Sequence, residues 1–149
     1  MRDRLPKLMP AWILGTLLAL AACAHAPGKG MDRDVTLRLT NSGAEPLRCS
    51  IVFGHWVYRE LGTLAPGQTH NIAMIQAAKD GALYVNRFDG ERQTMIENLI
   101  CGRMENRRDS RGQIDLASVR STQVTGVVAQ CAAPKDYGKI ICNVTEIAH

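Results

Sequence analysis

Hydrophobic and polar residues alternate along most of the chain after residue 34. The first alternating run holds Val35, Leu37 and Leu39, and a second extends from Leu47 to Phe53. A period of two places every second side chain on one face, as in a half-buried β-strand. Further strands are expected at 55–58, 72–75, 82–86, 94–101, 114–116, 125–131 and 139–146.

Turn-forming residues separate these runs and indicate the fold class. Clusters rich in Asn, Ser, Gly and Pro stand at 41–46 and 64–67, and Gly54 is expected to bulge the second strand. Many short strands between such turns predict an all-β, antiparallel sandwich or barrel-like module. A short helix is expected at 75–79 or within 102–111. The length of 149 residues fits one folded domain, which we place at 34–149.

The first 22 residues have the parts of a secretion signal. Arg2, Arg4 and Lys7 form a basic start, and an apolar run of 12 residues follows at 11–22. A membrane-spanning helix needs about 20 apolar residues. The run therefore favours a cleaved signal peptide over a permanent membrane helix.

The run ends in Leu20-Ala21-Ala22-Cys23, which resembles the lipobox of bacterial lipoproteins. This resemblance implies cleavage before Cys23, attachment of diacylglycerol to its thiol and acylation of the new amine. Several acyl chains hold a protein stably on a membrane. Ala24 at the next position implies sorting to the outer membrane of a Gram-negative cell, facing the periplasm. Residues 23–33 are then the lipidated cysteine and a flexible tether.

The part from 35 to 69 weakly resembles the opening of immunoglobulin-like and fibronectin-like extracellular modules. In those modules a strand, an Asn-x-Gly turn, a second strand and a Leu-x-Pro-Gly turn follow one another. Here the matching residues are Asn41-Ser42-Gly43 and the run from Leu61 to Gly67. The resemblance implies a β-sandwich and no single function.

Composition and charge narrow the classes of function. Hydrophobic residues make up 46% of the chain and charged residues 21%, which is typical of a globular protein. The leader holds three of the 18 basic and one of the 14 acidic side chains, so the mature chain carries 15 and 13. A net charge of +2, together with export, disfavours a nucleic acid as the partner.

Five cysteines predict two disulfides in the exported chain. Lipidation of Cys23 leaves Cys49, Cys101, Cys131 and Cys142. If the last two strands form a hairpin about Asp136 and Tyr137, residues 131 and 142 face each other, at a distance suited to a disulfide. Cys49 would then pair with Cys101, in a bond that could cross the core. A zinc site is the rival, but the spacing lacks Cys-x-x-Cys, so we expect neither metal nor cofactor.

The strongest candidate for chemistry is the pair His55 and Trp56. A histidine can act as an acid or base near neutral pH, and a tryptophan can stack on a sugar or peptide. The alternative is an ordinary strand pair, with Trp56 in the core and His55 outside, and we favour it because no orienting partner is evident. The chain has no Gly-x-Ser-x-Gly, His-Glu-x-x-His or phosphate-binding glycine loop.

Four arginines crowd one segment: Arg103, Arg107, Arg108 and Arg111. Planar guanidinium groups suit an anion site, for a lipid phosphate or an acidic partner. The alternative, which we favour, is a solvated mobile loop whose charges are balanced locally by Glu105 and Asp109.

These observations lead to two functional hypotheses. The first is a lipid-anchored envelope protein whose domain is a non-enzymatic binding or structural module for a protein or glycan partner. The second is an envelope enzyme, or an enzyme inhibitor, that uses a cleft around His55. Because no reaction motif is present, we expect the first.

Overall fold

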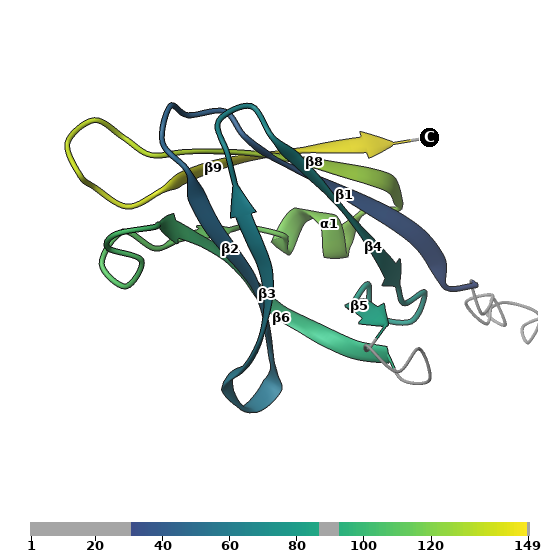
Figure 1. The fold of residues 1–149 in the computed structure, drawn as a ribbon. Coiled ribbons are helices and arrows are strands. Elements are labelled where there is room, and N and C mark those ends of the chain that lie inside the picture. The colour runs from purple at the N-terminus through teal and green to yellow at the C-terminus, as the bar shows by residue number, and fades with distance from the viewer. Residues whose placement is uncertain (1–30, 87–92, 149) are drawn as a thin grey trace, which may run out of the picture.

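The computed structural model describes residues 31–86 and 93–148, and β-strands dominate this part of the chain (Figure 1). A 3-10 turn, η1 (Gly54–Trp56), and one short helix, α1 (Ala117–Ser121), complete it. The predicted all-β fold is confirmed. The strands are β1 (Arg33–Asn41), β2 (Leu47–Phe53), β3 (Val57–Leu64), β4 (Thr69–Gln76), β5 (Leu83–Asn86), β6 (Gln93–Arg103), β7 (Gly112–Ile114), β8 (Val124–Ala132) and β9 (Ile141–Ala148).

The strands form one mixed sheet in the order β3-β2-β6-β5-β4-β1-β8-β9, and β7 pairs with β6 beside this path. In the described part, every pair is antiparallel except β1 with β8. This one parallel pair departs from the predicted antiparallel pattern. Six strands separate β1 from β8 along the chain, and so long a connection allows two strands to run in the same direction.

The β6 strand joins the two halves of the sheet. Its first residues pair with β5, through Met95 opposite Tyr84, whereas the stretch from Ile96 to Arg103 pairs with β2. The inward side chains of both halves form one hydrophobic cluster. Its fully buried members include Leu37, Leu39, Leu47, Ile51, Leu64, Met74, Leu83, Ile96, Leu99 and Ile114.

Two local predictions from the sequence are wrong. Residues 75–79 form the end of β4 and a turn, in which the Ala77 amide donates to the Ala82 carbonyl at 2.9 Å. Residues 102–111 form the end of β6 and a turn. The helix begins instead at Ala117, whose amide donates to the Asp115 carboxylate at 2.9 Å. A local side-chain acceptor of this kind starts a turn without any apolar helical period.

Gly54 does not bulge a strand but begins the η1 turn, which connects β2 to β3. The shifts of register occur between Cys49 and Ser50, and between Val52 and Phe53. The turn therefore reverses the chain at the tip of a hairpin, and it carries His55 there.

Both predicted disulfides are present. Cys131 on β8 faces Cys142 on β9, and Cys49 on β2 faces Cys101 on β6. The expectation that the second bond crosses the core is wrong, because β2 and β6 are neighbours in the sheet. Each disulfide thus ties two adjacent antiparallel strands.

The predicted signal peptide, Cys23 and most of the tether lie outside the described residues. Within the described residues, no helix has the length and apolarity needed to cross a membrane.

Candidate functional site

The η1 turn gives His55 an unusual backbone conformation. Its φ of 60° and ψ of 31° fall in the left-handed region, which residues other than glycine rarely adopt. Histidine, like asparagine and aspartate, enters this region more readily than most residues. The turn leaves the His55 side chain exposed at the hairpin tip.

A pocket of about 480 Å³ opens beside this turn. Its volume lies within the range of roughly 300–1,000 Å³ that is usual for ligand sites. Three large side chains of its wall are partly exposed, Val57 (52%), Tyr58 (43%) and Met95 (44%), whereas Phe53 is buried. Two strand pairs, β2–β3 and β5–β6, supply the wall, which also includes Gly54, His55, Arg59, Val85, Asn86 and Thr94.

Arg59 braces the polar side of this pocket. Its guanidinium donates to the Asn86 carbonyl at 3.0 Å and lies 5.9 Å from the centre of the Phe53 ring. Partial burial lowers the pKa of Arg59 from its usual value, but a guanidinium remains charged at any physiological pH. The pocket therefore combines apolar walls with one fixed cation.

The pocket does not assemble a catalytic group from the described residues. Within the part of the chain that the structure describes, the His55 side chain makes no hydrogen bond and no carboxylate lines the pocket. The hydroxyl-bearing residues Tyr58 and Thr94 are present in the wall. A general base needs a partner that orients its ring. The side chain of Trp56 lies outside the described residues, so its predicted contact with a ligand is not assessed.

The prediction of a solvated loop is wrong for Arg103, the last residue of β6. Arg103 is 6% exposed, and its guanidinium donates to the Glu45 carboxylate at 2.9 Å and to the Gly138 carbonyl at 2.8 Å. It also donates to the Pro134 carbonyl and lies 5.2 Å from the centre of the Tyr137 ring. Arg103, at the end of β6, thus ties the 42–46 loop to the 133–140 loop.

Sequence reasoning had a signal for the inward position of Arg103. Leu99, Cys101 and Arg103 follow the same alternation, and Leu99 and Cys101 face the core. The period of two therefore placed the arginine on the buried face, where it requires partners.

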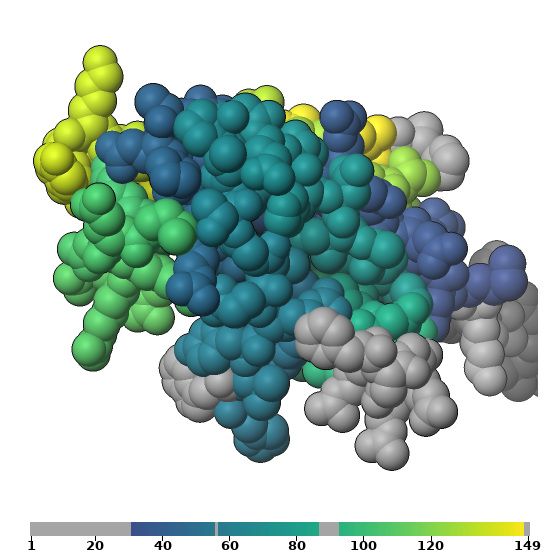
Figure 2. All heavy atoms as spheres, viewed as in Figure 1, coloured from purple at the N-terminus to yellow at the C-terminus, as the bar shows by residue number. Residues whose placement is uncertain are grey.

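The other three arginines are divided between two roles. Arg107 donates to the Glu60 carboxylate at 2.7 Å and to the Ser50 hydroxyl, whereas Arg108 and Arg111 are exposed. The green 104–111 segment lies beside the yellow 133–140 loop in Figure 2. The structure does not bring the four arginines together into one site.

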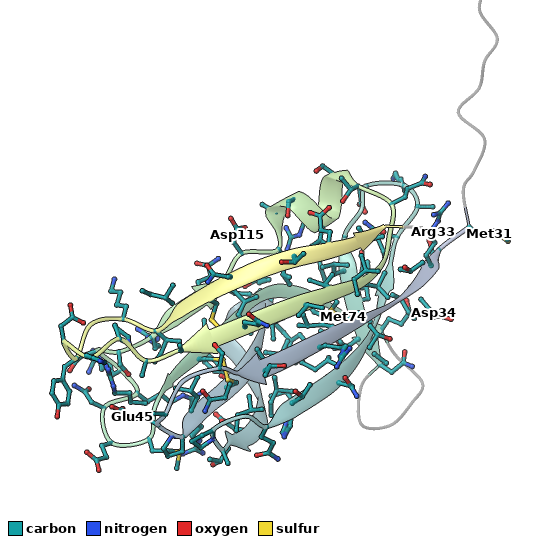
Figure 3. All side chains as sticks on the ribbon, turned by 90° about the horizontal axis from the view of Figure 1, so that it is seen from above. Met31, Arg33, Asp34, Glu45, Met74 and Asp115 are labelled. Carbon is teal, nitrogen blue, oxygen red and sulfur yellow. A yellow bond between two sulfur atoms is a disulfide. The ribbon has the colours of Figure 1, made fainter. Side chains whose placement is uncertain are left out.

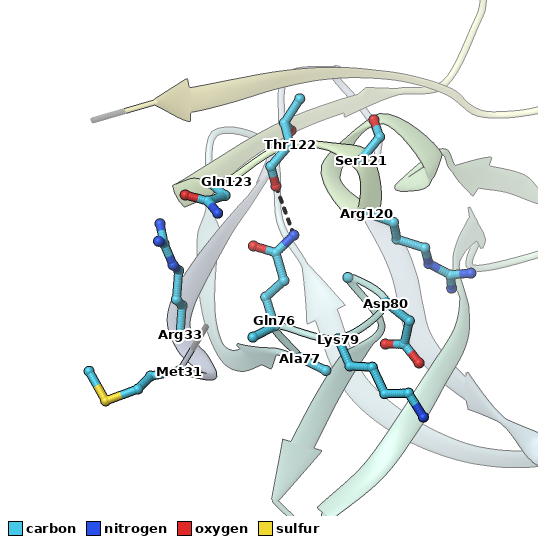
Figure 4. Close-up of a pocket in the computed structure, with 12 residues that line it drawn as sticks. Met31, Arg33, Gln76, Ala77, Lys79, Asp80, Arg120, Ser121, Thr122 and Gln123 are labelled. Carbon is cyan, nitrogen blue, oxygen red and sulfur yellow. Dashed lines mark hydrogen bonds between the residues drawn. The ribbon is translucent and has the colours of Figure 1, made fainter. Parts of the chain in front are cut away.

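Another hollow, of about 320 Å³, lies near the start of β1 (Figure 4). The Gln76 amide donates to the carbonyls of Val119 at 2.6 Å and Thr122 at 2.8 Å, and Arg120 donates to the Ile96 carbonyl at 3.0 Å. These polar groups hold α1 against the sheet, so this hollow has a structural role.

The sulfurs of Cys101, Cys131 and Cys142 lie within 4.8 Å of one another. All three belong to disulfides, and zinc binds thiolates rather than disulfide sulfurs. This cluster, as it stands in the oxidised protein, does not supply metal ligands.

Among these features, the pocket beside His55 combines size with exposed apolar walls, and it is the best candidate for a binding site. Models of known protein families, curated proteins and solved structures were compared with the chain, and none of them matches it.

Proposed function

We propose that this protein is a lipid-anchored component of the cell envelope, and that its β-domain binds a protein partner through the pocket beside His55. The basic start, the apolar run and the lipobox-like end at Cys23 support export and anchoring. The observation that carries the binding role is the pocket wall, where Val57, Tyr58 and Met95 are all partly exposed.

The residue types in this wall suit a protein interface. Tyrosine, phenylalanine, methionine and arginine are enriched in the buried centres of such interfaces, and the pocket contains Phe53, Tyr58, Arg59 and Met95. Methionine is flexible and adapts to irregular surfaces. When a partner covers exposed apolar side chains around a hollow, their removal from water lowers the free energy of the complex.

The position of β3 favours an extended segment as the occupant. In the described part, β3 ends the sheet order and pairs only with β2, and its first residues form part of the pocket wall. An edge strand offers backbone groups to which an incoming strand can pair. The partner would then add a strand along β3 and place an apolar side chain in the pocket.

An enzyme that uses His55 has less support. Tyr58 and Thr94 bring hydroxyls into the pocket, but no described group orients the His55 ring.

Site-specific photo-cross-linking in intact cells tests the proposal. A photoreactive side chain replaces Tyr58 in the full chain, and Tyr137, which is 83% exposed on a distant loop, serves as the control position. We expect a discrete protein adduct from position 58 only. Met95→Asp should abolish it, because a charge in the apolar wall loses its hydration when the partner binds.

Met104→Asp is the matched control for this substitution. Met104 is 46% exposed, close to the 44% of Met95, but it does not line the pocket. An adduct that survives Met95→Asp, or that forms equally at positions 58 and 137, contradicts the proposal.

A further inference from the structure

A second surface pocket, of about 470 Å³, lies between β6, β7 and the loop that precedes β9. Arg108, Arg111 and Lys139 line it. Its other lining residues are Asn98, Ile100, Gly112, Gln113 and Ile140.

The charged side chains that line this pocket are all positive. Among the described residues, no acidic side chain lines it, and Asp109, which stands between the two arginines in sequence, is outside the lining. The ion pairs formed among the described residues join Arg48 and Arg107 to Glu60, and Arg103 to Glu45. Three cations therefore share one hollow in which the described residues supply no carboxylate, and an anion placed between them would lower their mutual repulsion.

Backbone contacts join the two loops that carry these cations. The Ile140 amide donates to the Ser110 carbonyl at 2.8 Å, which joins the loop of Lys139 to the loop of the arginines. A Cβ atom on Gly112 would lie 1.9 Å from the Ile140 carbonyl oxygen, so only glycine permits this close approach. Arg111 Nε donates to the Arg108 carbonyl at 3.2 Å. The two loops that supply the cations are therefore held next to each other before a ligand binds.

The neutral polar side chains of this pocket indicate a ligand that carries polar groups besides its anionic group. Asn98 and Gln113 contribute carboxamides to the lining. The Oδ1 atom of Asn98 is buried and accepts no hydrogen bond from the described residues. A carboxamide can both donate to and accept from a hydroxyl, so this lining suits a ligand that carries hydroxyls beside its anionic group.

The pocket also lies away from the expected anchor. Met31 and Arg33 mark one end of the domain and Glu45 the other (Figure 3). Arg103 connects Glu45 to Gly138, the neighbour of Lys139. From Arg33 to Asn41, β1 spans about 26 Å at a rise of about 3.3 Å per residue. The pocket therefore lies toward the end of the domain opposite Met31.

We propose that this pocket binds a phosphorylated sugar, such as the phosphate-bearing unit of an envelope glycan. Arg108, Arg111 and Lys139 bind the phosphate oxygens, for which the guanidinium fork is well suited. Asn98 and Gln113 contact the sugar hydroxyls. This site is separate from the pocket beside His55 and does not depend on a protein partner there.

Titration of the detergent-solubilised mature protein, followed by NMR of the Gly112 and Gln113 amides, tests the proposal. The probes are glucose 6-phosphate, inorganic phosphate, glucose and glycerophosphoglycerol, the soluble headgroup of an anionic lipid. We expect glucose 6-phosphate to bind most tightly, glucose not to bind, and added salt to weaken binding. Arg108→Gln should weaken it about tenfold, the usual scale for a charge-assisted hydrogen bond.

Lys139→Gln and Lys135→Gln form a matched pair. Both lysines are exposed and belong to the same loop, but only Lys139 lines the pocket. We expect Lys139→Gln to weaken binding and Lys135→Gln to leave it unchanged. Equal effects of the two substitutions would show unspecific attraction to net charge and would overturn the site. Tighter binding of inorganic phosphate or of the lipid headgroup would overturn the assignment to a sugar.

Discussion

The sulfur of Cys101 lies within 4.8 Å of the sulfur of Cys131, although the two belong to different disulfides. The sulfur of Cys142, which is bonded to Cys131, also lies within 4.8 Å of the Cys101 sulfur. The β2–β6 and β8–β9 strand pairs supply these bonds, so the bonds meet where the two halves of the sheet enclose the core. The contact places each disulfide within reach of a thiol released from the other.

Loss of Cys49 alone should therefore cause disulfide exchange. In Cys49→Ser, the free Cys101 thiolate can attack the Cys131–Cys142 bond, forming a new bond to one sulfur and releasing the other as a thiolate. We expect non-reducing peptide mapping to find Cys101 linked to Cys131 or Cys142 in part of the protein. The double substitution Cys49→Ser with Cys101→Ser is the control. If Cys49→Ser has only the Cys131–Cys142 link, the sulfurs do not exchange.

The two disulfides should differ in their contribution to stability. The Cys49–Cys101 bond closes 52 residues and the Cys131–Cys142 bond 11. Loop-closure entropy then predicts losses of about 4 and about 3 kcal/mol when each pair is replaced by alanine. Urea unfolding of the two double variants measures this difference. A larger loss for the shorter loop would show that local packing, rather than chain entropy, determines the order.

Cys23 is expected to carry the membrane anchor. Metabolic labelling with a fatty-acid analogue should mark the wild-type protein and not Cys23→Ala, because only the thiol of the lipobox accepts diacylglycerol. Cell fractionation should then release the variant from the lipid-bound pool. Equal labelling of both proteins would contradict lipidation at this residue.

The local features of the fold were predictable from the sequence, since they depend on neighbouring residues. Val35, Leu37 and Leu39 follow a period of two and form the buried face of β1. The hairpin register fixes Cys131 opposite Cys142, and elimination then leaves Cys49 for Cys101.

Non-local features were not predictable. The parallel contact of β1 with β8 depends on segments some 90 residues apart, as Leu37 opposite Val127 shows. The partners of Arg103 lie 58 and 35 residues away, at Glu45 and Gly138. The pocket beside His55 likewise requires β5 and β6 to approach β3. A pattern confined to one strand carries no information on which distant strand will lie beside it.

The ion pairs of Glu60 predict that the stability of the folded protein depends on pH in the acidic range. Partial desolvation raises the pKa of Glu60, but hydrogen bonds and attraction from Arg107 and Arg48 together outweigh it and lower the pKa below its usual 4.5. A carboxylate whose pKa is lower in the folded protein than in the unfolded chain stabilises the folded state at pH values above its unfolded pKa. This contribution disappears as the pH falls through its folded pKa. Glu60→Gln should therefore lower the melting temperature at pH 7 but hardly at pH 3.

The effect of Glu60 should be small, because its side chain is 41% exposed and solvent screens the pairs. Melting curves at low and high salt provide the control, since added salt should shrink the difference at pH 7. A difference between wild type and Glu60→Gln that persists at pH 3 would show that Glu60 acts through packing instead of charge.

Arg103 should contribute more to stability than the neighbouring arginines. Arg103→Met keeps much of the buried volume but leaves the carbonyls of Pro134 and Gly138 without their donor, and Glu45 without its cation. Each buried group that loses its partner costs roughly 1–3 kcal/mol. Since Glu45 is half exposed and can return to water, we expect a total loss of about 3 kcal/mol. Arg108→Met, on the exposed part of the same segment, should change stability by less than about 0.5 kcal/mol.

Urea unfolding of Arg103→Met and Arg108→Met tests this order, and limited trypsin digestion adds a second measurement. In the wild-type protein, cleavage should occur after the exposed Arg108 or Arg111 and not after Arg103, whose side chain is enclosed by the 133–138 loop. In Arg103→Met, the freed loop should be cut early after Lys135, because nothing then ties its carbonyls to the end of β6. Equal stability of the two variants, with an unchanged digestion pattern, would mean that the Glu45, Pro134 and Gly138 contacts hold no loop in place.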